Sequence, residues 1–162
     1  VPPNTFLRRA ACSGEAAMTR SVPDTNIWFA SIEWYGRPRD IRVLGERRLI
    51  ILITSQAILA ELTHVMRDYF GYSDDEAYMW HKRITAHTDI VHPTRWVNAV
   101  PDDPDDNKFV ECALEGKAQY IISRDQDLLR LGEYEGVRMV DDVEFLAILR
   151  AEGIVKHLGQ GG

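Results

Sequence analysis

The sequence predicts an α/β fold, a three-layer α/β/α sandwich with a central, mostly parallel sheet. Short apolar runs alternate with helix-type segments along most of the chain, which is the pattern of strand–helix–strand units. The runs Leu49–Thr54 and Tyr120–Ile122 lack polar alternation, which is typical of strands buried on both faces. A length of 162 residues with 45% hydrophobic content suits one domain with a substantial core.

The first half of the chain is expected to hold two strands and three helices. These are a strand at 21–24, helices at 26–34 and 40–48, a strand at 49–54 and a helix at 55–70. The first strand is very short, and Pro23 within it cannot donate to a ladder. Gly36 and Pro38 end the first helix, and Ser55 caps the third. Apolar residues at helical spacing predict the core stripe of this third helix: Ile58, Leu62, Val65, Met66 and Tyr69.

The second half is expected to continue the alternation. Its elements are helices at 73–87, 105–116, 125–131 and 141–150, and strands at 89–92, 120–122 and 137–140. The run Ser73-Asp74-Asp75-Glu76 has the form of a capping box, and Asp141 with Glu144 marks the start of the last helix. A polar, proline-rich loop separates the strand at 89–92 from the helix that follows.

The two ends of the chain differ from the rest. Residues 1–20 show no sustained periodicity and are expected to form a flexible N-terminal extension, partly ahead of a natural start at Met18. The domain itself is expected over 21–151, with residues 152–162 as a flexible tail. No apolar run approaches the roughly 20 residues that cross a membrane, and the start lacks the features of a secretory signal. With only two cysteines and no expected structural disulfide, the sequence indicates a reducing, cytoplasmic location.

The net charge of −6 is the wrong sign for nucleic-acid binding by charge alone. Either the protein does not bind nucleic acid, or its acids gather where cations bridge to phosphates. Four acids lie at strand ends, near helix starts or beside an apolar helix stripe: Asp24, Glu61, Asp106 and Asp125. Because these places meet at one edge of a parallel sheet, we expect the four carboxylates to converge. Clustered carboxylates repel one another, and Mg²⁺ or Mn²⁺ stabilises such a cluster.

Four motifs between about Val22 and Leu149 resemble the PIN-domain pattern. They are Asp24-Thr25-Asn26, Glu61, Asp105-Asp106-Asn107-Lys108-Phe109 and Ser123-Arg124-Asp125-Gln126-Asp127-Leu128-Leu129. The resemblance implies a Mg²⁺- or Mn²⁺-dependent endoribonuclease that cleaves single-stranded RNA, often the toxin of a bacterial type II toxin–antitoxin pair. It also implies three partners, namely RNA, a cognate antitoxin and a second copy in a homodimer.

The resemblance implies roles for individual residues. Four acids match the metal-site and catalytic positions: Asp24, Glu61, Asp106 and Asp125. Three polar residues match supporting positions: Asn26, Ser123 and Asp127. Two cations are candidates for contact with RNA: Lys108 and Arg124. The sequence departs from the pattern at Pro23, where an apolar residue is usual, and at Ser123-Arg124, where Thr-Gly is usual. Neither departure removes a metal ligand.

Other interpretations compete with this one. The run Asp102–Asn107 is similar to a calcium loop, but Lys108 stands where an EF-hand needs glycine. Only Asp106 of this run is therefore expected to bind metal, and most of the run to lie in solvated loop and helix cap. A phosphatase of haloacid-dehalogenase type needs an acid at position 26, which is Asn. The alternative function is a non-catalytic or RNA-processing PIN-like module, although a non-catalytic one would usually have lost an acid.

The sequence alone leaves two interpretations for each of two stretches. Five arginines between Arg37 and Arg48 form either a solvated helix face or a patch that faces RNA. The apolar stretch Ile27–Tyr35 is either part of the core or a contact surface of the homodimer.

Overall fold

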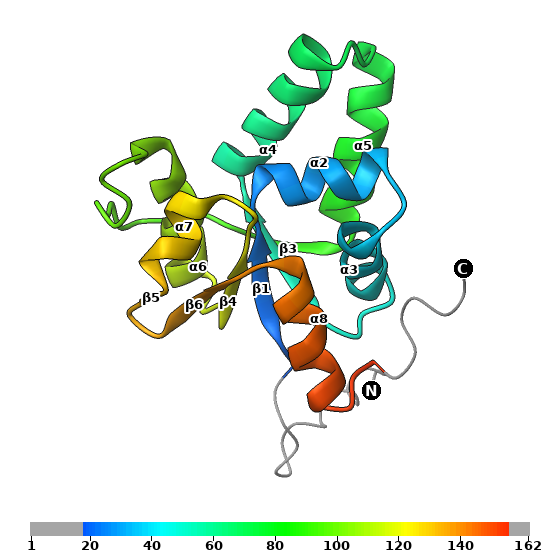
Figure 1. Ribbon diagram of the computed structural model, residues 1–162. Helices are drawn as coiled ribbons and strands as arrows, with labels where there is room; N and C mark the ends of the chain where they lie inside the picture. The colour runs from blue at the N-terminus through cyan, green and yellow to red at the C-terminus, as the bar shows by residue number, and fades with distance from the viewer. Residues whose placement is uncertain (1–17, 156–162) are drawn as a thin grey trace.

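The computed structural model describes residues 18–155, and within them a six-stranded sheet has the order β3-β2-β1-β4-β6-β5 (Figure 1). The strands are β1 (Arg20–Pro23), β2 (Ile51–Ser55), β3 (Thr88–Val91), β4 (Tyr120–Ile122), β5 (Glu133–Tyr134) and β6 (Val137–Val140). All neighbouring strands run parallel except the hairpin of β5 and β6. The predicted, mostly parallel sheet is thereby confirmed.

Helices cover both faces of this sheet. They are α2 (Thr25–Glu33), α3 (Arg37–Glu46), α4 (Gln56–His64), α5 (Asp74–Ala86), α6 (Asn107–Glu115), α7 (Gln126–Leu131) and α8 (Asp142–Ala151), with a π-helical turn η1 (Val65–Tyr69) and a 3₁₀ turn η2 (Pro104–Asp106). Adjacent residues of a strand point to opposite faces. Leu52 of β2 lies against Gly45 of α3, whereas Ile53 lies against Gly116 at the end of α6. Helices α3 and α6 therefore cover opposite faces, and α8 packs beside α3 (Figure 1). The predicted three-layer α/β/α sandwich is confirmed.

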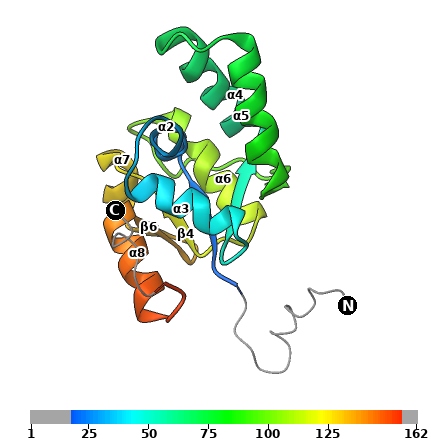
Figure 2. The same cartoon turned by 90° about the vertical axis from the view of Figure 1, so that its right-hand side faces the viewer.

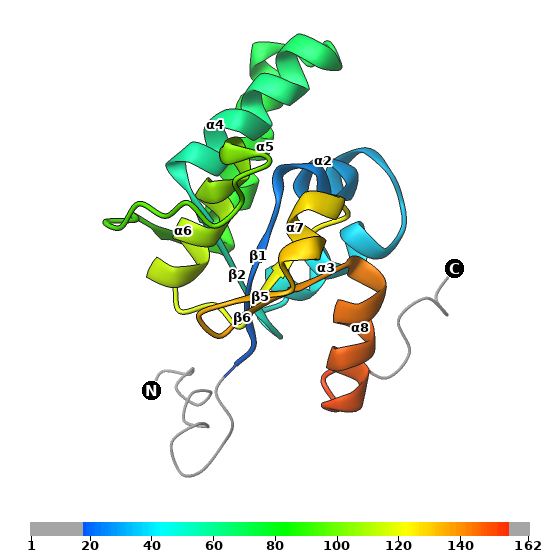
Figure 3. The ribbon, with the colours of Figure 1, turned by 60° about the vertical axis from the view of Figure 1, so that its left-hand side comes forward.

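Helices α4 and α5 form a pair that projects from the rest of the fold (Figures 2 and 3). The helix expected over 55–70 is regular only to His64, and its last turn is the π-helical η1. A π-helical turn contains more residues than an α-helical turn, so it shifts the residues after it around the helix axis. Met66 stays buried, but Tyr69 is 72% exposed, so the prediction of Tyr69 as core was wrong.

The remaining differences concern boundaries. Strand β5 was not predicted, because its two residues are too few to show a period. Helix α3 begins at Arg37 rather than Asp40. Pro38 is tolerated in the first turn of this helix, because a backbone N–H at that position would have no acceptor within the helix. The expected flexible ends fall mostly on residues 1–17 and 156–162, which lie outside the described residues. Among residues 18–155, no helix has the length and apolar character needed to span a membrane.

The arginine-rich stretch is divided between core and surface. Arg42 is buried, and its guanidinium donates to Glu46 Oε2 at 2.8 Å and to the Ser31 carbonyl. Arg47 and Arg48, directly after α3, are exposed. Arg42 therefore stabilises the fold and is not available to a ligand.

The apolar stretch Ile27–Tyr35 is divided in the same way. Trp28 and Phe29 belong to the buried core, whereas Trp34 is 56% and Tyr35 is 87% exposed. Only the end of this stretch is free to contact another molecule.

Candidate metal centre

Two of the predicted site residues begin helices directly after neighbouring strands. Asp24 follows β1 and caps α2, where its Oδ1 accepts from the Ile27 N–H at 2.9 Å. Asp125 follows β4 and caps α7, where its Oδ1 accepts from the Asp127 N–H at 2.9 Å. Because β1 and β4 are adjacent and parallel, both carboxylates lie at the same edge of the sheet. The unpaired N–H groups of a helix start favour negative charge there.

A cleft of about 210 Å³ opens at this edge. It is lined by the four acids that were expected to converge: Asp24, Glu61, Asp106 and Asp125. The rest of its wall consists of Thr25, Asn26, Val65, Asp103, Asp105 and Phe109. The fold thus brings together carboxylates from four segments that are far apart in the sequence.

Asp24 is the most enclosed of the four carboxylates, with 3% of its surface exposed. The Ser123 hydroxyl donates to Asp24 Oδ2 at 2.5 Å, and the Asp125 N–H donates to Ser123 Oγ at 2.9 Å. Burial, opposed by hydrogen bonds from Ser123 and Ile27 and assisted by the charges of Asp125 and Glu61, raises the pKa of Asp24 to about 6. Asp24 is therefore held in place at an energetic cost when it is ionised.

Glu61 reaches the cleft from α4 and is held by two neighbours. The Thr25 hydroxyl donates to Glu61 Oε1, and Lys108 Nζ lies 3.2 Å from Glu61 Oε2. Lys108 also donates to the Asp105 carbonyl at 2.7 Å. Lys108, a candidate for contact with RNA, is thus already engaged with the acidic site. The role of Thr25 was missed, although its place directly after Asp24 was the available signal.

Asp106 lies at the end of the 3₁₀ turn η2, with 8% of its surface exposed. Its Oδ2 is buried and has no hydrogen-bond partner among the described residues. Burial, together with the charges of Asp103 and Asp125, raises the pKa of Asp106 to about 7. A buried, ionised oxygen without a partner is costly unless a cation or a proton occupies the space beside it.

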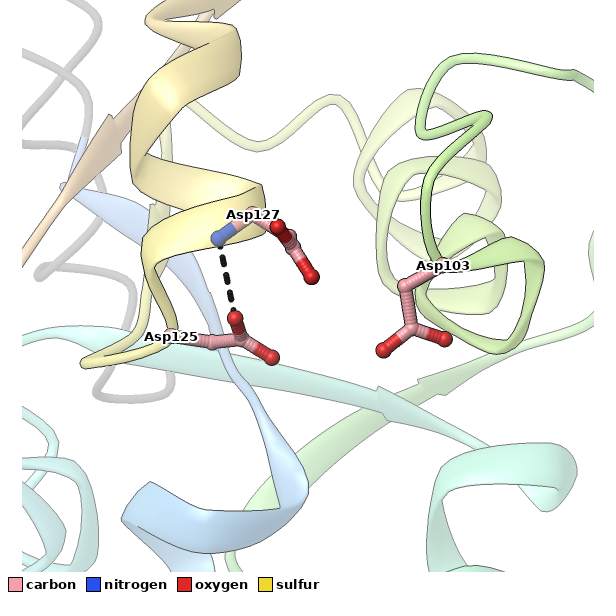
Figure 4. A group of neighbouring side chains, drawn as sticks. All are labelled: Asp103, Asp125 and Asp127. Carbon is pink, nitrogen blue, oxygen red and sulfur yellow. Dashed lines mark hydrogen bonds between the residues drawn. The ribbon is translucent and has the colours of Figure 1, made fainter.

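Three aspartates bring carboxylate oxygens within 4.8 Å of one another, namely Asp103, Asp125 and Asp127 (Figure 4). Asp125 and Asp127 belong to the start of α7, and Asp103 faces them from the loop before η2. Most of the run Asp102–Asn107 was expected to lie in solvated loop and helix cap, and Asp103 is an exception, because it is half-buried and lines the cleft. Pro104 directly after it begins η2 and fixes the turn that aims Asp103 inward.

The other predicted residues occupy different positions around the centre. Asn26 is exposed at the edge of the cleft. Arg124 is not in the cleft wall. Its guanidinium donates to both carboxylate oxygens of Asp142, at 2.9 and 2.8 Å. The structure therefore brings Asn26 to the acidic cleft and directs Arg124 to a second, neighbouring ion pair.

The chemistry of this cleft suits a hard divalent cation. All of its charged ligand atoms are carboxylate oxygens, the donors that Mg²⁺ and Mn²⁺ prefer. Two of the acids, Asp24 and Asp106, have raised pKa values because of burial and mutual repulsion. The unpartnered Oδ2 of Asp106 offers a further ligand atom.

Comparisons with known proteins agree with this geometry. The PIN domain family matches residues 20–127, about two thirds of the chain. No curated protein matches the chain significantly. The crystal structure of PAE2754 from Pyrobaculum aerophilum is similar, with 13% identity and a TM-score of 0.55 over 83% of this chain and 99% of that one.

A second solved structure has a comparable likeness. It is VapBC2 from Rickettsia felis bound to a DNA fragment from the promoter, with 11% identity and a TM-score of 0.52 over 76% of this chain and 98% of that one. At these identities, the two likenesses establish the fold alone. The family match covers more than half of the chain and spans the segments that supply the cleft. The chain belongs to the PIN-domain family, whose members are generally nucleases that typically use a divalent metal ion.

Proposed function

We propose that the protein is a Mg²⁺- or Mn²⁺-dependent endoribonuclease that cleaves single-stranded RNA, as the toxin of a type II toxin–antitoxin pair. The observation that carries the proposal is the cleft in which four carboxylates from distant segments meet. Membership of a family of nucleases supports phosphodiester hydrolysis as the reaction. The acidic cleft also accounts for the net charge of −6, because metal ions bridge acids to phosphates.

In this proposal Asp24, Glu61, Asp106 and Asp125 hold the metal and are the catalytic acids. Two further carboxylates extend the set of oxygen donors: Asp103 and Asp127. Ser123 and Thr25 position the ligands, since their hydroxyls hold Asp24 and Glu61 in the orientations described above. The bound ions would activate a water molecule and neutralise charge on the leaving oxygen, giving products with 5′-phosphate and 3′-hydroxyl ends.

The residues at the edge of the cleft would orient the RNA. Asn26 presents its amide to solvent beside the acids, where it can donate to a phosphate oxygen or to a base. Lys108 would shift part of its contact from Glu61 to the substrate when metal takes over the charge of Glu61. Both side chains thus lie where a bound strand would enter.

A cognate antitoxin and a second copy of the chain are the proposed protein partners, and the cytoplasm the proposed location. The fold likeness to VapBC2 supports the antitoxin, and the exposed Trp34 and Tyr35 offer a limited surface for self-association. Light scattering across micromolar concentrations tests the homodimer, and the mass of a single chain throughout would contradict it. Co-expression with the reading frame directly upstream tests the antitoxin, since a cognate protein should relieve growth inhibition.

The decisive experiment is cleavage of end-labelled single-stranded RNA by purified protein in Mg²⁺, in Mn²⁺ and in EDTA. We expect internal cleavage with either metal and none in EDTA. Asp125→Asn should abolish cleavage, whereas Asp75→Asn, an exposed acid of α5, should leave it unchanged. Cleavage that persists in EDTA, or an Asp125→Asn variant as active as wild type, would refute the metal mechanism.

The same assay separates the rival functions. A non-catalytic module would bind RNA without cleaving it in any metal. A phosphatase would release phosphate from p-nitrophenyl phosphate and leave RNA intact. A general RNA-processing enzyme would cleave structured RNA at least as well as single strands.

A further inference from the structure

A second cavity lies beside the acidic cleft and differs from it in charge. It has a volume of about 290 Å³ and is lined by the end of α2, the start of α3 and the residue before Asp125. Its wall consists of Ala30, Trp34, Tyr35, Gly36, Arg37, Pro38 and Arg124. The first cleft is walled by acids, whereas this one is walled by aromatic rings and guanidinium groups.

The two arginines are fixed by one buried carboxylate. Asp142, at the start of α8, is 2% exposed and accepts from Arg37 Nε at 2.7 Å and from Arg124 Nε and Nη2 at 2.9 and 2.8 Å. Two guanidinium groups share this one carboxylate, and Asp141 and Asp24 are the other acids close enough to act on Arg124. Each arginine side chain is 52% exposed, and most of the N–H donors of each have no hydrogen-bond partner among residues 18–155. The carboxylate thus holds two guanidinium groups ready for an anion.

The aromatic residues of the cavity are also held in position. Tyr35 is 87% exposed, and the Arg39 guanidinium lies 4.6 Å from its ring centroid on one side. Trp34 packs edge-on against Phe29, with 5.8 Å between the ring centroids. Gly36 follows with φ +149°, a conformation that side chains other than hydrogen rarely adopt, and this turn places Tyr35 and Arg37 at the same cavity. An open aromatic face beside fixed cations is what a stacked base with its phosphate needs.

One face of α2 links the two cavities. Asn26 lines the acidic cleft, and Ala30 and Trp34 line the second cavity. These residues are four apart, so they lie in one row along the helix surface, about 12 Å from the first to the last. On the opposite wall, Arg124 directly precedes Asp125 of the acidic cleft. A strand that leaves the cleft along this row reaches the arginine pair within a few nucleotides.

We propose that the cavity of Arg37, Arg124, Trp34 and Tyr35 is a binding subsite for single-stranded RNA that flanks the metal centre. The arginine pair binds a phosphate of the backbone, and Tyr35 stacks on the adjacent base. The inference builds on the proposed nuclease function, since it names where the RNA strand lies beyond the cleaved bond. The subsite itself needs no metal, so it should bind RNA in EDTA.

The test measures binding of a labelled oligouridine of about 12 nucleotides by fluorescence anisotropy in EDTA. Arg37→Gln keeps the Arg124–Asp142 pair and should weaken binding about tenfold. It should also reduce the slope of log K against log salt by about 0.7, the loss of one phosphate contact on a single strand. Tyr35→Ala should weaken binding by about tenfold without a change of salt slope. The matched controls are Arg47→Gln and Tyr78→Ala, exposed residues far from the cavity, which should bind as wild type does.

Each outcome decides one question. Cleavage of RNA by wild type together with unchanged binding by Arg37→Gln and Tyr35→Ala would overturn the subsite and leave the proposed function standing. Binding that depends on Arg37 without cleavage in any metal would support the subsite and overturn the nuclease. A labelled oligoglutamate that binds more tightly than oligouridine would overturn the subsite in favour of an acidic protein segment. Light scattering that shows Tyr35→Ala changing from dimer to monomer would assign Tyr35 to self-association instead.

Discussion

Replacing Asp106 by asparagine should make the metal-free protein more stable while it disables the enzyme. The side chain keeps its shape, and only the charge is lost. Asp106 is 8% exposed, its Oδ2 has no partner among the described residues, and Asp103 and Asp125 lie close enough to raise its pKa. An asparagine amide in the same place can donate to those carboxylates instead of repelling them.

The size of the stabilisation follows from the raised pKa. The pKa of Asp106 rises from 3.8 to about 7, and each pKa unit corresponds to about 1.4 kcal/mol. At pH 8 ionised Asp106 therefore lowers the free energy of unfolding by at most about 4 kcal/mol. Because water enters the open cleft, we expect about 1–2 kcal/mol in practice, a rise in Tm of about 2–8 °C for a domain of this size. Below about pH 4 Asp106 is protonated in both the folded and the unfolded state, so the difference between the two proteins should nearly disappear there.

The same substitution should lower catalytic activity, although it raises stability. A neutral amide is a poorer ligand for a divalent cation than a carboxylate, so the affinity for Mn²⁺ should fall. Cleavage of single-stranded RNA should fall by roughly 100-fold or more, because the ions supply both water activation and charge neutralisation. Thermal melts with and without Mn²⁺, paired with cleavage rates on the same protein, measure both effects.

The control for this experiment is Asp102→Asn. Asp102 lies in the same loop with a side chain that is 76% exposed, so both stability and cleavage should match wild type. Asp103 is unsuitable as a control because it lines the cleft. An Asp106→Asn variant that cleaves at the wild-type rate, or that melts below wild type at pH 8 without metal, would refute the reasoning.

Three further predictions concern the rest of the molecule. In EDTA the raised pKa of Asp24, about 6, means that the folded state binds more protons than the unfolded state between pH 4 and 6. The free energy of unfolding should therefore fall as pH rises through that window, and Asp24→Asn should flatten the dependence in thermal melts. Asp142→Asn removes the carboxylate shared by two arginines and should destabilise the protein by about 2–4 kcal/mol in urea titrations, whereas an unchanged midpoint would contradict a structural role for this ion pair. Gly45→Ala places a methyl group 2.7 Å from Leu52 Cδ1 and should cost about 1–3 kcal/mol, measured in the same way, and a midpoint equal to that of wild type would contradict the close packing of α3 on β2.

The local pattern of the sequence predicted the sheet and the acids of the cleft well, for a physical reason. Runs such as Tyr120–Ile122 are apolar on both faces because helices cover both faces of a parallel sheet. The carboxyl end of each apolar run then marks the edge of the sheet at which the following loops and helix starts lie. Asp24 and Asp125 lie at such ends, so their arrival at one edge could be anticipated without knowing the order of the strands.

Other features depended on contacts that no local pattern contains. Whether Asp103 faces solvent or the cleft is decided by the turn of η2, which sets the direction of the loop against α7. The pairing of Arg124 with a neighbouring acid depends on α8, whose Asp142 lies 18 residues further along the chain. The exposure of Tyr69 depends on a π-helical turn, which periodic spacing in the sequence does not reveal.

The position of β1 between β2 and β4 has a consequence for the newborn chain. The Asp24–Ser123 hydrogen bond spans 99 residues, and β1 gains its second neighbour only when β4 has been made. Pairings so distant in sequence form late and slowly, because a long loop must close before they yield any stability. During synthesis, Asp24 leaves the ribosome long before Asp125, and the cleft is incomplete until nearly the whole domain has emerged. The acidic centre is therefore not yet assembled while the ribosome is still translating the chain.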